Sequence, residues 1–481
     1  MFRIMAVLVV AVSALGFGAA YGQETALSAK PWTFPSDAEI RRILAQRIDE
    51  QHQGVGMVVG VIDAHGRRVI SYGTLDKADP RQPDGRTIFE IGSVTKVFTS
   101  LLLADMVQSG EVKLDDPMAK YLPPGTKVPE RGGRQITLID LATHTSGLPR
   151  LPTNFTPQDP SDPYADYSAQ KLYAFLKGYS LPRDIGAKYE YSNTGAGLLG
   201  YALARRAGMD FGALVQRRIT GPLGMRSTAI TLAPAEMSRL APGHDARLNR
   251  SANWDFTTLA GAGALRSDAD DMLTFLGAEL GYVKTPLAKA MKAQLEPRRP
   301  TDIPNTVIAL GWHITAPLVW HDGGTGGYRS MIAFDPKQGV GVVVLSNTFT
   351  TAGVDDILVH LFAGTPLAPP PPPPPPPTPS VEHHASAVDA TVLQGLVGRY
   401  QAAPNLVVEI TLQDGQLYAR LTGQPRFPVF PEGQHRVFWK VVDAQADFAV
   451  DARGRATAMT LHQGGQDLQA PRIEDKAKPG P

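Results

Sequence analysis

Ser93 and Lys96 are the residues of this 481-residue chain whose types and spacing best suit covalent chemistry. They precede the apolar run 97–103, and residues i and i+3 of a helix lie on one face. A serine hydroxyl is a weak nucleophile until a neighbouring base takes its proton, and a lysine kept neutral by desolvation can be that base. The pair predicts a serine hydrolase that works without a catalytic histidine–aspartate pair.

The spacing of this pair is weak evidence alone, because it also occurs where a helix simply begins. Ser168 and Lys171 have the same spacing, and there we expect Ser168 to be the N-cap of a helix over residues 169–176. Helix capping is therefore the alternative interpretation for Ser93 as well.

Two further groups of residues follow Ser93 in order along the chain. Tyr191-Ser192-Asn193 precedes a helical pattern, so the phenol and the amide can face a shared cleft, unless Ser192 or Asn193 only caps the helix. The stretch His321-Asp322-Gly323-Gly324 follows an apolar run, and glycines at a strand edge let a substrate backbone approach closely. The alternative interpretation of this glycine-rich stretch is a bulged hairpin strand. The ordered set of three groups, with its flanks, indicates an active site.

The elements that must position these groups include strands at both ends of the catalytic part. One hairpin is predicted around Ala64-His65-Gly66, and a second joins strands 329–334 and 340–345 through the turn at residues 335–339. Strands at both ends of a helical middle predict an α+β fold, an antiparallel sheet covered by helices with an inserted all-helical subdomain.

With its flanks, this ordered set resembles the class C β-lactamase and DD-peptidase superfamily of penicillin-recognising serine hydrolases. The resemblance covers about residues 35–365, and the stretches that carry it are residues 89–96, 110–117, 141–149 and 221–225. It implies that the reactive serine opens a buried helix between the sheet and the helical subdomain.

The resemblance also implies a role for each site residue. Ser93 attacks a carbonyl group, Lys96 accepts its proton, and Tyr191 passes a proton to the leaving group, with the base role shared between Lys96 and Tyr191. Asn193 contacts the substrate amide, and His321 and Gly323 belong to the substrate-binding strand. The backbone N–H groups of Ser93 and Gly324 hold the oxyanion.

His321 departs from the family pattern, which usually has Lys-Thr-Gly where this chain has His321-Asp322-Gly323. A histidine is often uncharged at neutral pH, whereas a lysine offers a permanent charge to a substrate carboxylate. We expect weaker carboxylate binding than in Lys-Thr-Gly relatives, improving below about pH 6.5.

Three classes of function remain open from the sequence. The first is cleavage of D-Ala-containing peptides, by a DD-carboxypeptidase, endopeptidase or D-aminopeptidase, or of β-lactams. The second is a carboxylesterase with the same Ser-Lys-Tyr site, and the third is an inactive binding or scaffold protein that retains the fold. No metal or organic cofactor is implied, and the sequence leaves the oligomeric state open.

Composition and the N-terminus favour an exported protein. Arg3, an apolar run and a small-residue exit at residues 20–22 predict a cleaved signal peptide over residues 1–22, hence a periplasmic or secreted protein without stable membrane insertion. The alternative is a retained anchor. Removing this segment takes away one arginine and leaves equal numbers of basic and acidic residues, so no nucleic-acid partner is expected. The chain has no cysteine, which excludes disulfides and thiol catalysis.

The chain divides at nine consecutive prolines, residues 369–377, which predict an extended spacer. Short alternating runs follow, with a hairpin signal at Asp414-Gly415, and they predict an antiparallel β-barrel that resembles the lipocalin-like C-terminal domains of some superfamily members. We expect a catalytic domain over residues 31–366, a linker over 367–387 and the barrel over 388–475.

Overall fold

The computed structural model describes residues 34–350, 354–369, 383–403, 406–422, 426–440, 444–463 and 466–473. They fall into two compact units, one made mostly of residues up to Pro372 and the other mostly of residues from Pro373 onward. The predicted signal peptide, residues 1–22, and most of the predicted linker lie outside the described residues. Within the described ranges, no helix is both long and apolar enough to cross a membrane.

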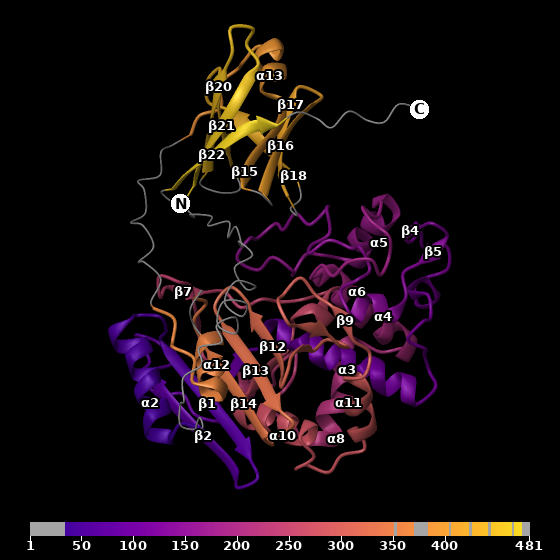
Figure 1. The fold of residues 1–481 in the computed structure, drawn as a ribbon, viewed down its shortest axis with the longest axis vertical. Coiled ribbons are helices and arrows are strands. Elements are labelled where there is room, and N and C mark those ends of the chain that lie inside the picture. The colour runs from indigo at the N-terminus through magenta and orange to yellow at the C-terminus, as the bar shows by residue number, and fades with distance from the viewer. Residues whose placement is uncertain are drawn as a thin grey trace. The chain divides into compact units, whose positions relative to one another are not determined.

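An eight-stranded antiparallel sheet forms the centre of the first unit (Figure 1), in the order β2-β1-β14-β13-β12-β11-β10-β9. Both predicted hairpins are present, and β1 pairs with β14, so the two ends of the catalytic part close one sheet as predicted. The strands are β1 (Gly56–Asp63), β2 (Gly66–Gly73), β9 (Arg299–Pro300), β10 (Val307–Ile308), β11 (His313–Thr315), β12 (Leu318–Gly324), β13 (Arg329–Asp335) and β14 (Val340–Ser346).

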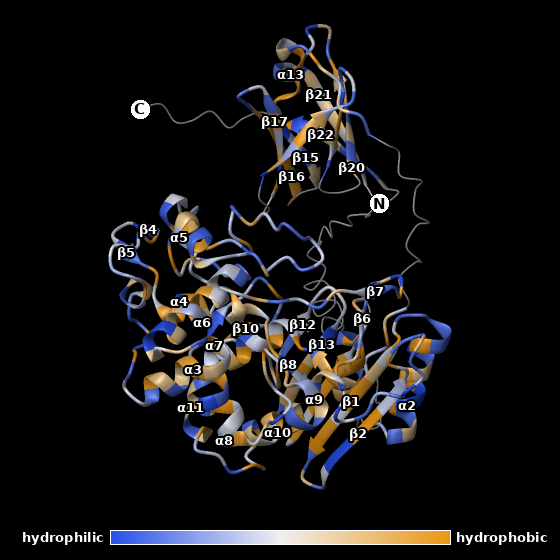
Figure 2. Cartoon of the chain, turned by 180° about the vertical axis from the view of Figure 1, so that it is seen from behind, coloured by the Kyte–Doolittle hydropathy of each residue, from blue (hydrophilic) through white to orange (hydrophobic). Residues whose placement is uncertain are grey.

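Helices cover both faces of the sheet because its central strands are apolar on both sides. The edge strand β2 is more polar and more exposed than the apolar β1, as the colours of Figure 2 show. Met57, Val59 and Val61 of β1 join a core with α2 (Asp37–Ala45) and α12 (Asp355–Ala363). The intervening Gly60 faces Leu273 of α10 (Ala269–Glu279) on the opposite side.

Helices also dominate the region inserted between β3 (Ile88–Glu90) and β8 (Arg266–Asp268), which pair with each other outside the main sheet. Short two-residue ladders join β4 (Glu130–Arg131) to β5 (Arg134–Gln135) and β6 (Gly243–His244) to β7 (Arg250–Ser251). The helices of this region are α3 (Thr95–Gln108), α4 (Leu138–Ala142), α5 (Ala169–Gly178), α6 (Asn193–Ala207), α7 (Phe211–Val215), α8 (Gly221–Leu223) and α9 (Pro234–Met237). Helix α11 (Ala288–Gln294) follows α10 and packs against α3.

The second unit is a closed antiparallel barrel of eight strands, as predicted, preceded by α13 (Ala390–Leu396). The expected turn at Asp414-Gly415 joins β16 to β17, and both turn residues have positive φ. Alternate strand residues fill the interior, with Tyr400 and Trp439 among them. Its strands are β15 (Gly398–Ala403), β16 (Leu406–Gln413), β17 (Gln416–Leu421), β18 (Arg426–Pro431), β19 (Arg436–Trp439), β20 (Ala444–Val450), β21 (Ala456–Gln463) and β22 (Gln466–Ile473).

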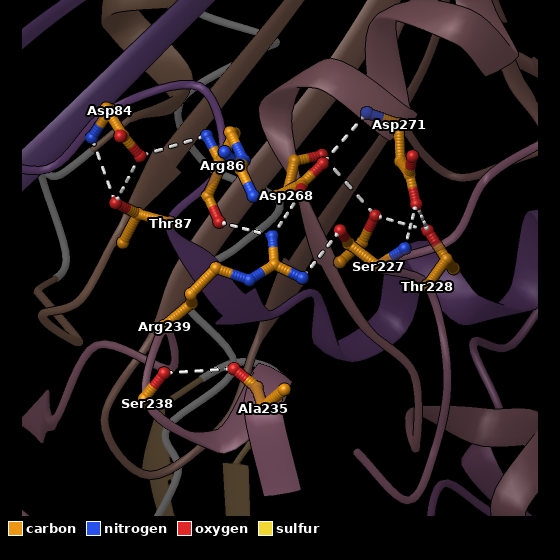
Figure 3. A network of polar contacts seen from close by, with 11 residues as sticks. Asp84, Arg86, Thr87, Ser227, Thr228, Ala235, Ser238, Arg239, Asp268 and Asp271 are labelled. Carbon is orange, nitrogen blue, oxygen red and sulfur yellow. Dashed lines mark hydrogen bonds and ion pairs between the residues drawn. The ribbon is translucent and has the colours of Figure 1, made fainter. Parts of the chain in front are cut away.

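A polar network in the first unit fixes the strand that leads to Ser93 (Figure 3). The Arg239 guanidinium donates to the Arg86 carbonyl oxygen at 3.1 Å, just before β3, and to the Ser227 hydroxyl at 3.0 Å. It also lies 3.4 Å from the Asp268 carboxylate, at the end of β8 and the start of α10. Because β3 and β8 are paired, the network ties the entry to the Ser93 turn to the helix on the sheet.

Candidate active site

Ser93 lies in a 3₁₀ turn, Gly92–Val94, between β3 and α3. The structure thus places the serine just before a helix whose residues Thr95–Ala104 are all buried, in agreement with the helix expected from the resemblance. The Lys96 Nζ lies 2.9 Å from the Ser93 Oγ and 2.7 Å from the carbonyl oxygen of Ala262. Only 1% of Lys96 is exposed, so the amine is almost entirely withdrawn from bulk solvent.

Burial sets the ionisation of Lys96. It lowers the pKa of this amine well below its ordinary value, and the positive charge of Arg150 lowers it further. The carboxylate of Asp322 acts in the opposite direction and is outweighed. A neutral Lys96 can accept the Ser93 proton across the 2.9 Å contact, which is the chemistry that the sequence predicted.

Tyr191 reaches the same serine from the start of α6. Ser192 caps this helix by accepting from the Gly195 N–H at 2.8 Å, as the capping interpretation expected, and this leaves Tyr191 just outside the helix. The Tyr191 ring centroid is 4.9 Å from the Lys96 Nζ, and the Ser93 side chain partly offsets the rise in the Tyr191 pKa. Burial and the Asp322 charge raise the Tyr191 pKa, so the tyrosine stays protonated. These directions favour Lys96 over Tyr191 as the base.

Asn193 is the first residue of α6 and offers an acceptor to a substrate. Its Nδ2 donates to the Tyr164 hydroxyl at 3.0 Å, while its Oδ1 is buried and has no hydrogen-bond partner within the described part of the chain. A buried amide oxygen without a partner is costly, and a substrate N–H would satisfy it. This geometry supports the contact with the substrate amide that we expected.

Gly323 and Gly324 end β12 directly beside the serine turn. A β-carbon at Gly323 would meet the Ile91 carbonyl oxygen and would come within 3.1 Å of the Ser93 nitrogen. A β-carbon at Gly92 would likewise lie 2.6 Å from the Gly324 nitrogen, so the serine turn and the end of β12 are adjacent, as two backbone donors to one oxyanion must be. This close approach requires glycine, because any side chain would push the strand away from the turn.

His321 is fully buried on the same strand and is uncharged over most of the pH range. Its Nδ1 is 2.6 Å from the Asp322 carbonyl oxygen, and its Nε2 is buried without a hydrogen-bond partner in the described ranges. Burial lowers the His321 pKa to about 4, although the Asp322 charge opposes this shift. We expected carboxylate binding to improve below about pH 6.5. The pH of that prediction is wrong, because this histidine becomes charged only near pH 4.

Three site neighbours were not predicted from the sequence. The His144 ring lies against the Tyr191 ring, with centroids 4.6 Å apart, and its Nδ1 accepts from the Ser192 N–H at 3.1 Å. Arg150 places its guanidinium carbon 5.3 Å from the Tyr191 ring centroid, and Asp322 lies between His321 and Gly323. His144 and Asp322 belong to stretches that carry the family resemblance, and Arg150 directly follows one, but these stretches do not show which way a side chain points.

Comparisons with known proteins agree with this geometry. Residues 40–363 match the family described as Beta-lactamase, and residues 382–474 match a domain of unknown function, DUF3471. The D-alanyl-D-alanine-carboxypeptidase/endopeptidase AmpH of Escherichia coli (strain K12) is 31% identical over 370 residues, which cover 71% of this chain and 94% of that protein. Penicillin-binding protein 4* of Bacillus subtilis (strain 168) is 24% identical over 462 residues and covers 90% of this chain and 98% of its own.

Solved structures show the same relationship. A beta-lactamase/D-alanine carboxypeptidase from Yersinia pestis has a TM-score of 0.59 at 28% identity and covers 68% of this chain and 98% of its own. A class C beta lactamase from Rhodobacter sphaeroides has a TM-score of 0.58 at 27% identity, with 68% of this chain and 100% of its own covered.

Proposed function

The chain belongs to the Beta-lactamase family and is a serine hydrolase, and from this premise we propose that it cleaves amide bonds of D-Ala-containing peptides or of β-lactams. The single observation that carries the proposal is the 2.9 Å contact between the Ser93 hydroxyl and the Lys96 amine, whose pKa is held well below its ordinary value by burial. Relatives with names of both activities, peptidase and β-lactamase, match the chain at similar identity.

The proposed acylation follows from the positions of four groups. The Ser93 Oγ attacks the carbonyl carbon while Lys96 takes the hydroxyl proton, and the carbonyl oxygen becomes an oxyanion beside the N–H groups of Ser93 and Gly324. The carbon–nitrogen bond then breaks, and the protonated Tyr191 hydroxyl supplies a proton to the leaving amine. The proton that Lys96 took from Ser93 then returns to the Tyr191 oxygen, so the acylation step leaves both groups in their starting protonation states.

Hydrolysis of the acyl-enzyme completes the proposed cycle. Water attacks the Ser93 ester, and its proton passes to the Lys96–Tyr191 pair while the serine oxygen leaves as the hydroxyl. The rate of this step separates the two candidate activities, because slow deacylation gives a penicillin-sensitive peptidase and fast deacylation gives a β-lactamase. A difference of 1.4 kcal/mol in this barrier changes the rate about tenfold.

A carboxylesterase is the second candidate, and the structure offers one observation in its favour. His321 is neutral and buried where Lys-Thr-Gly relatives have a cation, so β12 offers no permanent positive charge to a substrate carboxylate at neutral pH. An ester substrate does not need such a charge. The same acyl-enzyme on Ser93 serves both reactions.

We also propose export, with the signal peptide over residues 1–22, and the domain division at 31–366, 367–387 and 388–475. The separate barrel unit and the match of residues 382–474 to DUF3471 support the last boundary. The similarity to lipocalin-like domains rests on the closed eight-stranded barrel.

Three substrates test the proposed function on one preparation: benzylpenicillin, an N-acylated D-Ala-D-Ala peptide and a p-nitrophenyl ester. We expect the wild-type enzyme to turn over at least one of the two amide substrates, and the Ser93→Ala variant to turn over none. Turnover of the ester alone would replace the proposal with the carboxylesterase. If Ser93→Ala kept the activity of the wild type, Ser93 would not be the nucleophile.

A further inference from the structure

The site carries a second cation besides Lys96, and its position suggests how a substrate is oriented. This inference rests on the proposed function and adds the recognition of a charged group. Arg150 follows the loop of residues 143–149, and its carbonyl oxygen accepts from the N–H groups of Asn193 at 3.0 Å and Thr194 at 3.2 Å. Its backbone is therefore fixed to the start of α6, the element that presents Tyr191 and Asn193.

The Arg150 side chain extends over the tyrosine that is proposed to serve the leaving group. Its guanidinium carbon lies 5.3 Å from the Tyr191 ring centroid, and the Lys96 Nζ lies 4.9 Å from the same centroid. The charge of Arg150 contributes to lowering the pKa of Lys96 and opposes the raised pKa of Tyr191 and Tyr164. Arg150 is thus close enough to act on groups at the reacting centre.

Arg150 has no carboxylate partner in the described part of the chain, although its guanidinium is partly buried. Arg329, the cation on the neighbouring strand β13, differs in this respect. It lies 2.5 Å from the Asp355 carboxylate and 3.8 Å from that of Asp322, so its charge is already compensated. A partly buried guanidinium with five donors and no carboxylate is suited to bind a planar anion.

Asp322 carries a carboxylate on β12, 3.8 Å from the Arg329 guanidinium, whose charge Asp355 also compensates. Its carboxylate lies on β12 between His321 and Gly323, and 20% of its side chain is exposed. A substrate anion placed along this strand would meet a like charge, with only a neutral histidine beside it. Recognition of an anion on β12 is therefore disfavoured, and the free cation lies on the α6 side.

We propose that Arg150 is the anion-binding residue of this site and holds a carboxylate on the leaving group of the substrate, in place of the cation that β12 lacks. The leaving group meets Tyr191 in the proposed reaction, and Arg150 lies over the ring of Tyr191. The recognised chemistry is a carboxylate on the amine or alcohol that departs, as at the C-terminus of a peptide.

Two aryl esters that differ in one group test this assignment: a phenylacetate ester with a meta-carboxylate on the leaving phenol, and the same ester with a meta-carboxamide. For Arg150→Gln we expect KM for the carboxylate ester to rise by about tenfold to a hundredfold, the range for a charged hydrogen bond. KM for the carboxamide ester should stay within about twofold by the same argument. Arg150→Lys keeps the charge and should recover most of the discrimination.

Two further variants sharpen the test. Asp322→Asn removes the like charge on β12 and should lower KM for the carboxylate ester relative to the carboxamide. Arg226→Gln removes an exposed arginine elsewhere on the surface and should leave both esters unchanged.

The ratio of the two KM values decides the outcome. A ratio that is the same in wild type and Arg150→Gln would overturn the proposal, even if both esters slowed together, because a purely electrostatic effect on Lys96 and Tyr191 acts equally on both. Failure of the proposed acyl-serine chemistry has a different signature: wild type would turn over neither ester, or Ser93→Ala would turn over both. Failure of the proposed amide cleavage alone shows instead in the assays with benzylpenicillin and the D-Ala-D-Ala peptide.

Discussion

Gly92 lies so close to the backbone of Gly324 that position 92 has no room for a side chain. A β-carbon at Gly92 would lie 2.6 Å from the Gly324 nitrogen, and Gly92 itself has a φ of 48°. Two segments more than 200 residues apart in sequence thus meet through bare backbone, beside the nucleophile. In the proposed mechanism this contact sets the spacing of the two oxyanion donors.

Gly92→Ala should therefore damage catalysis more than folding. The added methyl group pushes Gly324 away from Ser93, and loss of one oxyanion donor typically lowers kcat by about 10²–10³. Steady-state kinetics on any accepted substrate measure this loss. Gly125→Ala is a matched control, because Gly125 also has positive φ but has no atom within 4 Å of the added carbon. Equal kcat values in the two variants would contradict the assigned oxyanion site.

Lys96 should control the acidic limb of the pH–rate profile. Only the neutral amine accepts the Ser93 proton, and burial holds the Lys96 pKa well below the ordinary value of a lysine. We expect kcat/KM to fall as the pH drops through that lowered pKa and to be flat at pH 9 to 10, a range in which an ordinary lysine is still titrating. A profile that keeps rising to about pH 10.5 would show that Lys96 is an ordinary, charged lysine.

His321 should make the fold sensitive to mild acid. Its pKa is about 4 in the folded protein against about 6.5 when unfolded, so the unfolded state binds the proton first as the pH falls. The stabilising contribution is present above about pH 6.5 and is lost as the pH falls toward 4. Denaturant unfolding at pH 7 and pH 5 should show a smaller loss of stability in His321→Gln than in wild type. An equal loss in both proteins would contradict the buried, neutral state of His321.

Asp271 should have the opposite dependence on pH. Burial and the neighbouring Asp268 raise the Asp271 pKa to about 6, so its contribution to stability is present below the ordinary value of 3.8 and is lost as the pH rises to about 6. Its Oδ2 accepts from the Ser227 N–H and the Thr228 hydroxyl, contacts that an asparagine oxygen can partly retain (Figure 3). Asp271→Asn should gain stability relative to wild type between pH 4 and pH 7 in thermal or urea unfolding. A difference that does not change with pH would reject this assignment.

The sequence predicted the elements whose signals are local. The hairpin turn at Ala64–Gly66, the cap at Ser168, where the side chain accepts from the Lys171 N–H, and the turn at Asp414-Gly415 each depend on a few adjacent residues. The sequence also predicted that strands at both ends of the catalytic part share one sheet, and the pairing of β1 with β14 closes that sheet.

The surroundings of the site residues could not be predicted from such local signals. Besides Ser93, the Lys96 amine contacts the Ala262 carbonyl oxygen, 166 residues away, and a backbone oxygen has no signal in the sequence. The pKa of His321 depends on complete burial, which the tertiary structure alone decides. Arg150 lies over Tyr191 because its backbone binds the start of α6, a contact between a loop and a helix with no motif of its own.

The most direct test of the acyl-serine account is intact-protein mass spectrometry of the enzyme incubated with benzylpenicillin, followed by peptide mapping. Ser93→Ala and Ser168→Ala are compared, because the second serine has the same spacing to a lysine but only caps a helix. We predict a penicilloyl adduct or drug hydrolysis in wild type and Ser168→Ala, with any adduct on Ser93, and neither in Ser93→Ala. An adduct or drug loss that persists in Ser93→Ala would contradict the account.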